Sequence, residues 1–187
     1  MQTLRHDIVS DDSEALILVD SDDNELGALD KSACHDGEGI LHRAFSLFIF
    51  NDSDELLLQK RAADKRLWPD FWSNSCCSHP RQGEDMAEAV QRRCEQELGF
   101  STDLAFVYKF EYTAPFADHG TEHELCSVYV GKHTGELDVN ASEVSAIQWL
   151  SIDRVDAELS SQPTLYTPWF QLEWARLRGE FADVLPV

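Results

Sequence analysis

Positive charges are scarce in this sequence. Among its 187 residues, 15 are lysine or arginine and 35 are aspartate or glutamate, which gives a formal net charge of −20. A surface this negative repels nucleic acid and anionic lipid, so we expect neither as a partner. An anionic ligand could bind only through a few well-placed cations or a metal ion.

Long hydrophobic runs are also missing. The most apolar stretches, residues 15–19 and 44–50, fall far short of the roughly 20 residues that a membrane-spanning helix needs. The first residues carry acidic side chains and no apolar segment, so they do not resemble a signal peptide. The five cysteines are an odd number, and the adjacent pair Cys76 and Cys77 is poorly placed for disulfides. We therefore expect a cytoplasmic protein with reduced thiols.

The length and composition predict one folded domain over residues 1–187. Hydrophobic residues make up 43% of the chain, and a domain near this length buries roughly 70% of the surface of its unfolded chain. Strands are expected over residues 15–20, 41–50, 55–61, 106–116, 123–132 and 143–150, and helices over 84–99, 151–159 and 163–180. Strands on both sides of a central helix indicate an α+β fold with a mixed sheet.

The connections between these elements can also be predicted. The strands 41–50 and 55–61 are expected to pair as a hairpin across a short polar turn. Residues 20–27 are expected to form a turn and residues 61–83 a long loop. Loops of that length are usually functional or disordered, and the tryptophans in this one argue against disorder.

The helix expected over residues 84–99 carries charged side chains on its apolar face. At about 100° per residue, its core stripe contains Met86, Ala87, Ala89, Val90 and Cys94. Arg93 and Glu97 fall in the middle of this stripe, where burial of a charge is costly unless it is partnered. Two interpretations stay open: a buried structural ion pair, or a Glu97 that meets a metal and an Arg93 that meets an anion.

The motif Glu122-His123-Glu124 places two acids on one side of a strand. Because side chains alternate along a strand, Glu122 and Glu124 share an inward-looking face that continues to Val130. Two buried acids repel each other unless a cation or a proton lies between them, and a solvated strand end is the alternative interpretation.

A hydroxyl on an apolar face likewise needs a partner. This applies to Tyr112, which shares its face with Phe106, Tyr108 and Phe110.

Three histidines complete a possible ligand set. His35 and His42 flank a turn-like segment, and His79 lies in CCSHP. Together with Glu122 and Glu124 they could form a five-ligand site, since imidazole and carboxylate suit Mn²⁺, Zn²⁺ or Mg²⁺. The spacing matches no zinc-finger pattern, and any one of these histidines alone is more often an ordinary core or surface residue.

Several motifs, in order along the chain, resemble one known family. They are LDKSACHDGEGILHRAFSLFIFN, LLLQKRAADKRLWPDFWSNSCCSHP, AVQRRCEQELG, FEYTAP, EHELC and TPWF, spread from about Leu29 to Trp169. On these residues the chain resembles the type 1 isopentenyl-diphosphate isomerases, which belong to the Nudix-fold superfamily. The resemblance implies a mixed sheet sandwiched by helices, with a C-terminal helical segment. It also implies conversion of isopentenyl diphosphate to dimethylallyl diphosphate in isoprenoid biosynthesis.

The central helix allows a comparison with the Nudix hydrolase pattern, G-x5-E-x7-R-E-U-x-E-E-x-G-U. With Gly99 taken as the last glycine, the matching residues are Glu84, Arg92, Glu97, Gly99 and Phe100, and the departures are Ser78, Arg93 and Gln96. Hydrolysis of a diphosphate by such a site needs several helix carboxylates to hold metal ions and activate water. Because two of these carboxylates are replaced, one of them by a cation, we expect diphosphate binding without hydrolysis.

By matched position, the resemblance implies a role for each candidate site residue. The implied ligands of a divalent metal (Mg²⁺, Mn²⁺ or Zn²⁺) are His35, His42, His79, Glu122 and Glu124. The implied catalytic residues are Cys77, Glu124, Tyr112 and Trp169. The family pattern has cysteine two positions before His-Pro, which selects Cys77 over Cys76. Glu97 is implied to hold a Mg²⁺ that bridges the substrate diphosphate, and the implied cations around that diphosphate are Lys31, Arg61, Lys65 and Arg93.

The implied reaction moves a double bond. An unactivated alkene is protonated at one carbon and loses a proton from another, so two proton-handling groups must face opposite sides of a flat substrate. Cys77 and Glu124 would supply them, and the face of Trp169 would stabilise the carbocation without attacking it. The expected partner is thus a small isoprenyl diphosphate, and we expect the protein to act as a monomer.

Less specific interpretations stay open beside these. Lys31, Arg61 and Lys65 could be solvated surface charges. Trp169 could fill the core, and Cys77 could be an inert buried thiol. The chain could also be a Nudix diphosphohydrolase with another substrate, or a metal-binding domain of the same fold without activity. A flavin-dependent isomerase is disfavoured because no G-x-G-x-x-G fingerprint occurs.

Overall fold

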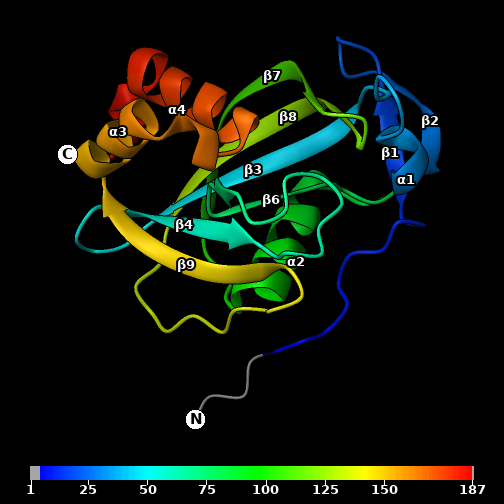
Figure 1. Cartoon of the computed structure of the whole chain (residues 1–187). Coiled ribbons are helices and arrows are strands. Elements are labelled where there is room, and N and C mark those ends of the chain that lie inside the picture. Colours follow the sequence, from blue (N-terminus) through cyan, green and yellow to red (C-terminus); the bar gives the residue numbers. More distant parts are fainter. Residues whose placement is uncertain (1–4, 187) are drawn as a thin grey trace.

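The computed structural model describes residues 5–186, which fold around a mixed β-sheet (Figure 1). The strands in this range are β1 (Ala15–Val19), β2 (Glu25–Asp30), β3 (His42–Phe50), β4 (Glu55–Arg61), β5 (Trp72–Ser73), β6 (Cys76–Ser78), β7 (Leu104–Phe116), β8 (Gly120–Lys132) and β9 (Val144–Ser151). The helices are α1 (Lys31–Cys34), α2 (Met86–Leu98), α3 (Ile152–Ser161) and α4 (Pro168–Glu180), with 3₁₀ turns η1 (Pro163–Leu165) and η2 (Ala182–Val184). No helix within residues 5–186 is long and apolar enough to cross a membrane.

The strand β3 lies in the middle of the sheet. It runs parallel to β8, in register from His42↔Glu124 to Phe50↔Lys132, and antiparallel to β6. On the far side of β8, the long strand β7 completes an antiparallel hairpin. The strand β4 pairs with β5 and β9. The predicted α+β fold with a mixed sheet is confirmed.

The predicted antiparallel hairpin of β3 and β4 is present, but it is short. These consecutive strands pair only beside the turn that joins them, at Phe50↔Leu56. Further along, β3 pairs with β6 and β8, while β4 pairs with β5 and β9. The polar turn is a local hairpin signal, but the longer ladders with distant strands bury more cross-strand side-chain pairs and decide the pairing.

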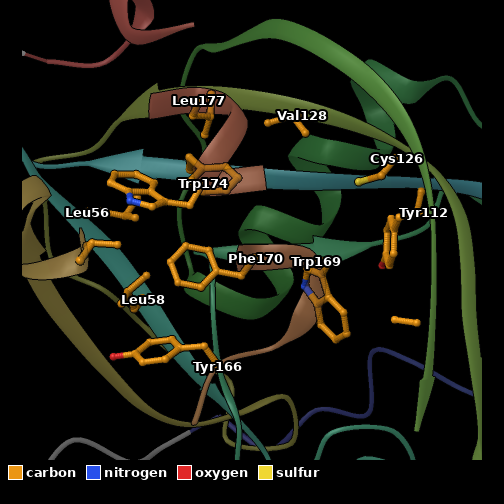
Figure 2. Close-up of a cluster of buried hydrophobic side chains, with 14 of the residues drawn as sticks. Leu56, Leu58, Tyr112, Cys126, Val128, Tyr166, Trp169, Phe170, Trp174 and Leu177 are labelled. Atoms are coloured by element: carbon orange, nitrogen blue, oxygen red, sulfur yellow. The ribbon is translucent and has the colours of Figure 1, made fainter. Parts of the chain in front are cut away.

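Helices cover both faces of the sheet, as predicted (Figure 1). Side chains of β3 alternate between the two faces. Phe45, Leu47 and Ile49 pack with α2 on one face, and Phe48 and Phe50 pack with α4 on the other. In the second of these cores, Figure 2 shows side chains of the sheet and of α4 packed together: Leu56, Leu58, Val128, Phe170, Trp174 and Leu177.

The helix α2 lies where its sequence pattern predicts. The Asp85 side chain accepts a hydrogen bond from the Ala87 backbone N–H at 2.8 Å and caps the start of the helix. Gly99 ends it with a φ of 84°, a left-handed conformation that favours glycine. Ala87, which we expected in the core stripe, is exposed. The predicted helix α3 is confirmed too, with Ser151 as its N-cap.

Three segments differ from the prediction. The helix expected from residue 163 begins at Pro168, because Thr167 before this proline is extended (ψ 145°) and residues preceding proline avoid helical geometry. The turn expected over 20–27 ends earlier, because β2 begins at Glu25. The short helix α1, which was not predicted, follows β2. The loop expected over 61–83 contains β5 and β6, two strands too short to show a period of their own.

One strand face also differs. Phe106 is 55% exposed, whereas Tyr108 and Tyr112 are buried. A register shift between Phe106 and Tyr108 interrupts the alternation along β7. Phe106 is therefore not part of the buried face that holds Tyr112.

Candidate active site and metal centre

Three adjacent strands bring His42, Glu124 and Tyr112 into one row. Glu124 on β8 is the Cα partner of His42 on β3 and of Tyr112 on β7. Residues directly opposite each other on neighbouring strands project to the same face, so these three side chains point the same way. Tyr112 Oη donates to Glu124 Oε2 at 2.5 Å, which gives the tyrosine hydroxyl the partner that its apolar face requires.

Glu122 and Glu124 share a buried face, as the alternation along the strand predicts, and each is 7% exposed. They meet three histidines: His35 at the end of α1, His42 at the start of β3, and His79 just after β6. One ligand atom from each of the five residues lies within 4.8 Å of the others. The histidines and glutamates named from the sequence are therefore brought together in one group.

The atoms of this histidine–glutamate group fit a divalent metal ion. The Nδ1 atoms of His35 and His42 lie 2.6 and 2.7 Å from the carbonyl oxygens of Lys31 and Ile40. They therefore carry the ring protons and leave each Nε2 free to ligate. Within residues 5–186, His42 Nε2 and Glu122 Oε2 are buried without a hydrogen-bond partner. Imidazole nitrogen and carboxylate oxygen together suit Mg²⁺, Mn²⁺ or Zn²⁺.

The electrostatics of the group are consistent with metal binding. His79 Nε2 lies 2.8 Å from Glu124 Oε1, and His35 Nε2 lies 2.8 Å from Glu122 Oε2, although the angles at the second contact are not those of a hydrogen bond. Burial opposes ionisation of both glutamates, but the neighbouring histidines hold their pKa values below the usual range. Burial lowers the pKa of His79 to about 4, so its ring is neutral near pH 7, which is the form that ligates a metal.

The thiol of Cys77 is held by neighbours from two other segments. It donates to Asn74 Oδ1 at 3.2 Å, and its Sγ lies 3.1 Å from Trp169 Nε1, whose N–H also reaches Ser73 Oγ at 3.0 Å. Burial raises the pKa of Cys77 to about 12, so the sulfur carries its proton near pH 7. The neighbouring Cys76 packs into the core on the α2 side instead.

A cavity of about 420 Å³ joins these groups. Its walls include Cys77 from β6 and Glu124 from β8, with Tyr112 and Trp169 beside them. Every predicted site residue lines this cavity except His42, which is fully buried. A thiol and a carboxylate thus line one cavity.

Arg93 and Glu97 form the buried ion pair that the helix pattern suggests, and each is 2% exposed. Arg93 Nε lies 3.1 Å from Glu97 Oε1, and its Nη2 lies 3.0 Å from Glu143 Oε2. Lys65 Nζ donates to the same oxygen of Glu143. The buried pair is therefore present, and both residues also line the cavity, where an anion could meet Arg93.

The two remaining predicted cations also have defined positions. Lys31 Nζ donates to Ser10 Oγ, and burial, together with two nearby cations, lowers the pKa of Lys31. Arg61 donates to two backbone carbonyls, and its guanidinium lies 5.2 Å from the centre of the Trp169 ring. Neither side chain is a fully solvated surface charge.

Several residues that line the cavity were not predicted from the sequence. Glu143 joins Lys65 and Arg93, which lie 78 and 50 positions away in the chain. Ile8, Ser10, Asp11 and Asp12 also line the cavity, and the carbonyl of Val9 accepts a hydrogen bond from Arg93 at 2.7 Å. No local pattern could reveal these residues, because their partners are far apart in sequence. Two other missed lining residues are Gln59 and Arg66.

Comparison with known families matches residues 40–170 to the NUDIX domain. Isopentenyl-diphosphate Delta-isomerase 1 of Photorhabdus laumondii is 42% identical over 174 residues, which cover 92% of this chain and 99% of that protein. Isopentenyl-diphosphate Delta-isomerase of Serratia proteamaculans is 43% identical over 157 residues, or 84% of this chain and 87% of that protein. Among solved structures, DR0079 from Deinococcus radiodurans has a TM-score of 0.72 at 20% identity and covers 87% of this chain and 98% of its own.

These similarities agree with the architecture of the chain. The Deinococcus structure supports the Nudix fold alone, because its sequence identity is low. The two isomerases match the chain at more than twice that identity and over most of both lengths. The chain therefore belongs to the NUDIX domain family and, within it, to the isopentenyl-diphosphate Delta-isomerases.

Proposed function

We propose that this protein converts isopentenyl diphosphate to dimethylallyl diphosphate, a step of isoprenoid biosynthesis. The relatives that it matches over most of their length carry the name of this activity. The structural observation that carries the proposal is that Cys77 and Glu124 line one cavity from separate strands. They are the two proton-handling groups that movement of a double bond requires.

The reaction adds a proton to one carbon of an unactivated alkene and removes a proton from another. The tertiary carbocation between these steps must be kept from water, and the buried side chains of Tyr112 and Trp169 on the cavity wall favour this. Cys77, a thiol near pH 7, and Glu124, hydrogen-bonded to Tyr112, exchange protons with the substrate from the two sides of its flat hydrocarbon. Trp169 stabilises the positive charge through its ring without forming a bond to it.

The histidine–glutamate group would hold one divalent metal ion. When bound, the ion would fix the carboxylate of Glu124 and lower its pKa. Mg²⁺, Mn²⁺ and Zn²⁺ all accept this donor set. The other oxygen of Glu124 accepts the hydrogen bond from Tyr112, so this carboxylate is oriented from two sides.

The diphosphate of the substrate binds among the cations of the same cavity. A chain with a net charge of −20 must concentrate positive charge locally to hold this anion. The residues that would do so are Lys31, Arg61, Lys65 and Arg93. Glu97 accepts from Arg93 through Oε1, and the remainder of its carboxylate would hold a Mg²⁺ that offsets the charge of the diphosphate.

The helix α2 favours isomerisation over hydrolysis of the diphosphate. Two positions at which the hydrolase pattern has acids carry Arg93 and Gln96. Of the acids that remain, Glu84 lies 2.6 Å from Arg92 and Glu97 is paired with Arg93. Few free carboxylates are left to hold metal ions and activate a water molecule.

We further propose that the protein acts as a cytoplasmic monomer without nucleic acid or membrane partners. The net charge of −20 supports the exclusion of anionic polymers and lipids. All five cysteines are free, which suits a reducing compartment. The metal ligands and the catalytic groups all come from one chain, so the site needs no partner subunit.

Deuterium exchange tests the proposed function. Incubation with isopentenyl diphosphate in heavy water should place deuterium in both isopentenyl and dimethylallyl diphosphate, measured by mass spectrometry. A parallel incubation with nucleoside diphosphate derivatives measures phosphate release. Phosphate release without exchange would assign the chain to the hydrolases, and metal uptake with neither activity would make it a non-catalytic domain.

A further inference from the structure

We infer that Gln59 is a further substrate-binding residue, whose side-chain amide contacts a diphosphate oxygen of isopentenyl diphosphate. The inference rests on the proposed function and extends it to a residue to which the family resemblance assigned no role. Gln59 lies on β4 and lines the same cavity as Cys77 and Glu124.

The first observation is an unpaired polar atom. Gln59 is only 3% exposed, yet its Oε1 has no hydrogen-bond partner within residues 5–186. Buried polar groups are almost always paired, because an unpaired one weakens the folded state. Since this side chain borders the cavity, a bound molecule can supply the missing partner. A polar side chain kept here at a cost to stability points to a ligand.

The second observation is the position of Gln59 relative to the thiol and to the cations of the cavity. It is the Cα partner of Ser73, whose Oγ lies 3.0 Å from Trp169 Nε1 and 3.7 Å from Cys77 Sγ. Residues opposite each other on neighbouring strands share a face, so Gln59 projects beside the thiol. Arg61, two residues further along β4, lines the same cavity. Gln59 thus borders the cavity next to the thiol and close in sequence to one of the cations proposed to bind the diphosphate.

The chemistry of the amide matches this place. Rotation about the last side-chain bond exchanges the amide oxygen and nitrogen, so Gln59 can present either a donor or an acceptor. Diphosphate oxygens accept hydrogen bonds, so the amide would rotate and its NH₂ group would donate to the diphosphate from the place where the unpaired oxygen now lies. An amide also adds a donor without adding charge next to Arg61.

The test compares Gln59→Leu, which removes the amide and keeps most of the volume, with Gln91→Leu. Gln91 on α2 also has a buried Oε1 without a partner in the described part of the chain, but it does not line this cavity. The measurements are KM and kcat for isopentenyl diphosphate, the Kd for inorganic pyrophosphate by calorimetry, and the midpoint of thermal unfolding.

Gln59→Leu should raise both KM and the Kd for pyrophosphate roughly tenfold or more, because it loses a hydrogen bond to a charged group. Its kcat should change little, and its unfolding midpoint should stay equal or rise, because an unpaired buried atom is removed. Gln59→Glu should weaken pyrophosphate binding further, by charge repulsion. Gln91→Leu should leave KM and Kd unchanged.

Unchanged KM and Kd in Gln59→Leu would overturn the inference, and so would a lowered unfolding midpoint with normal binding, the signature of a purely structural role. Either result leaves the isomerase activity of the wild-type chain in place. If instead the wild-type chain shows no deuterium exchange, the proposed function fails, and the pyrophosphate Kd values still decide whether Gln59 binds a diphosphate.

Discussion

Trp169 donates its indole N–H toward Cys77 Sγ at 3.1 Å, although the two residues are 92 positions apart in the chain. The same N–H reaches Ser73 Oγ, which lies 2.9 Å from Thr167 Oγ1. Trp169 therefore fixes the position of the sulfur in addition to presenting its ring to the cavity. The family resemblance had implied a role for the ring alone.

Replacing Trp169 by Phe or Leu separates these two contributions. Trp169→Phe keeps an aromatic face but loses the N–H, so kcat should fall severalfold, the effect of one hydrogen bond of about 1 kcal/mol. Trp169→Leu also loses the ring, so kcat should fall by roughly a further tenfold or more, since a desolvated cation–π contact is worth about 2 kcal/mol. Initial rates measure both, and equal kcat values for the two variants would contradict the role of the ring.

Cys77→Ala and Glu124→Gln should each reduce deuterium exchange into isopentenyl diphosphate by at least about 10²-fold, the usual contribution of a positioned acid or base. The matched control is Cys76→Ala, which removes the adjacent thiol from the opposite face of β6. This control should keep its exchange rate. Exchange at the wild-type rate in Cys77→Ala would remove the thiol from the mechanism.

His42→Ala should abolish retention of a divalent metal after dialysis, measured by elemental analysis, because it removes a ligand whose Nε2 has no other partner in residues 5–186. The control is His123→Ala. His123 lies between the two glutamate ligands in sequence but contacts Glu111 at 3.2 Å instead, so its loss should leave the metal bound. Chelation should also lower the unfolding temperature of the wild-type chain, since a metal at 100 times its Kd stabilises by about 2.7 kcal/mol. Full metal content in His42→Ala would refute the ligand set.

Glu97→Gln should lower the free energy of unfolding by about 3–5 kcal/mol, because it leaves the buried charge of Arg93 with one partner fewer. Glu158→Gln breaks an exposed pair with Arg154 on α3 at the same helical spacing and should cost less than about 1 kcal/mol. Urea unfolding of both variants makes the comparison. Similar losses of unfolding free energy in the two variants would show that the buried Arg93–Glu97 pair contributes no more to stability than an exposed pair.

Glu173 should make stability depend on pH. It is fully buried on α4, with Cys126 Sγ 3.4 Å from its Oε1, and burial raises its pKa from 4.5 to about 8. The folded state therefore keeps a proton that the unfolded chain releases above pH 4.5, so this residue should reduce stability as pH rises from 4.5 to about 8.

Glu173→Gln cannot ionise and should lose that part of the pH dependence. Its unfolding temperature should exceed that of the wild-type chain at pH 8 by more than at pH 5. Glu180→Gln, on the exposed end of the same helix, is the control and should follow the wild-type profile. Parallel profiles for Glu173→Gln and the wild-type chain would show that the buried carboxyl does not titrate in this range.

The features that could be predicted from sequence are those carried by short-range periodicity. The 3.6-residue pattern and the Gly99 cap define α2, and its apolar stripe already places Arg93 and Glu97 inside. The two-residue period of β8 places Glu122 and Glu124 on one buried face. In both cases one local element contains the whole signal.

What could not be predicted depends on contacts between distant segments. The long pairing of β3 with β8, beside its single paired position with β4, is a property of the assembled sheet. Glu143 and Gln59 look like ordinary polar residues beside their neighbours in sequence, and only the folded chain places them on the cavity. The family resemblance named the group of His35, His42 and His79 because it carries information on long-range contacts that periodicity lacks.

One strand register, that of β8 between β3 and β7, positions both the ion-binding group and the proton-transfer group. A slip of β8 by one residue against β3 and β7 would rotate both glutamates to the opposite side of the sheet. The imidazoles would then lose their carboxylates, and Tyr112 its acceptor, in one step. A lineage that shifted this strand could not give up ion binding and keep proton transfer, or the reverse, so both properties should persist or disappear together.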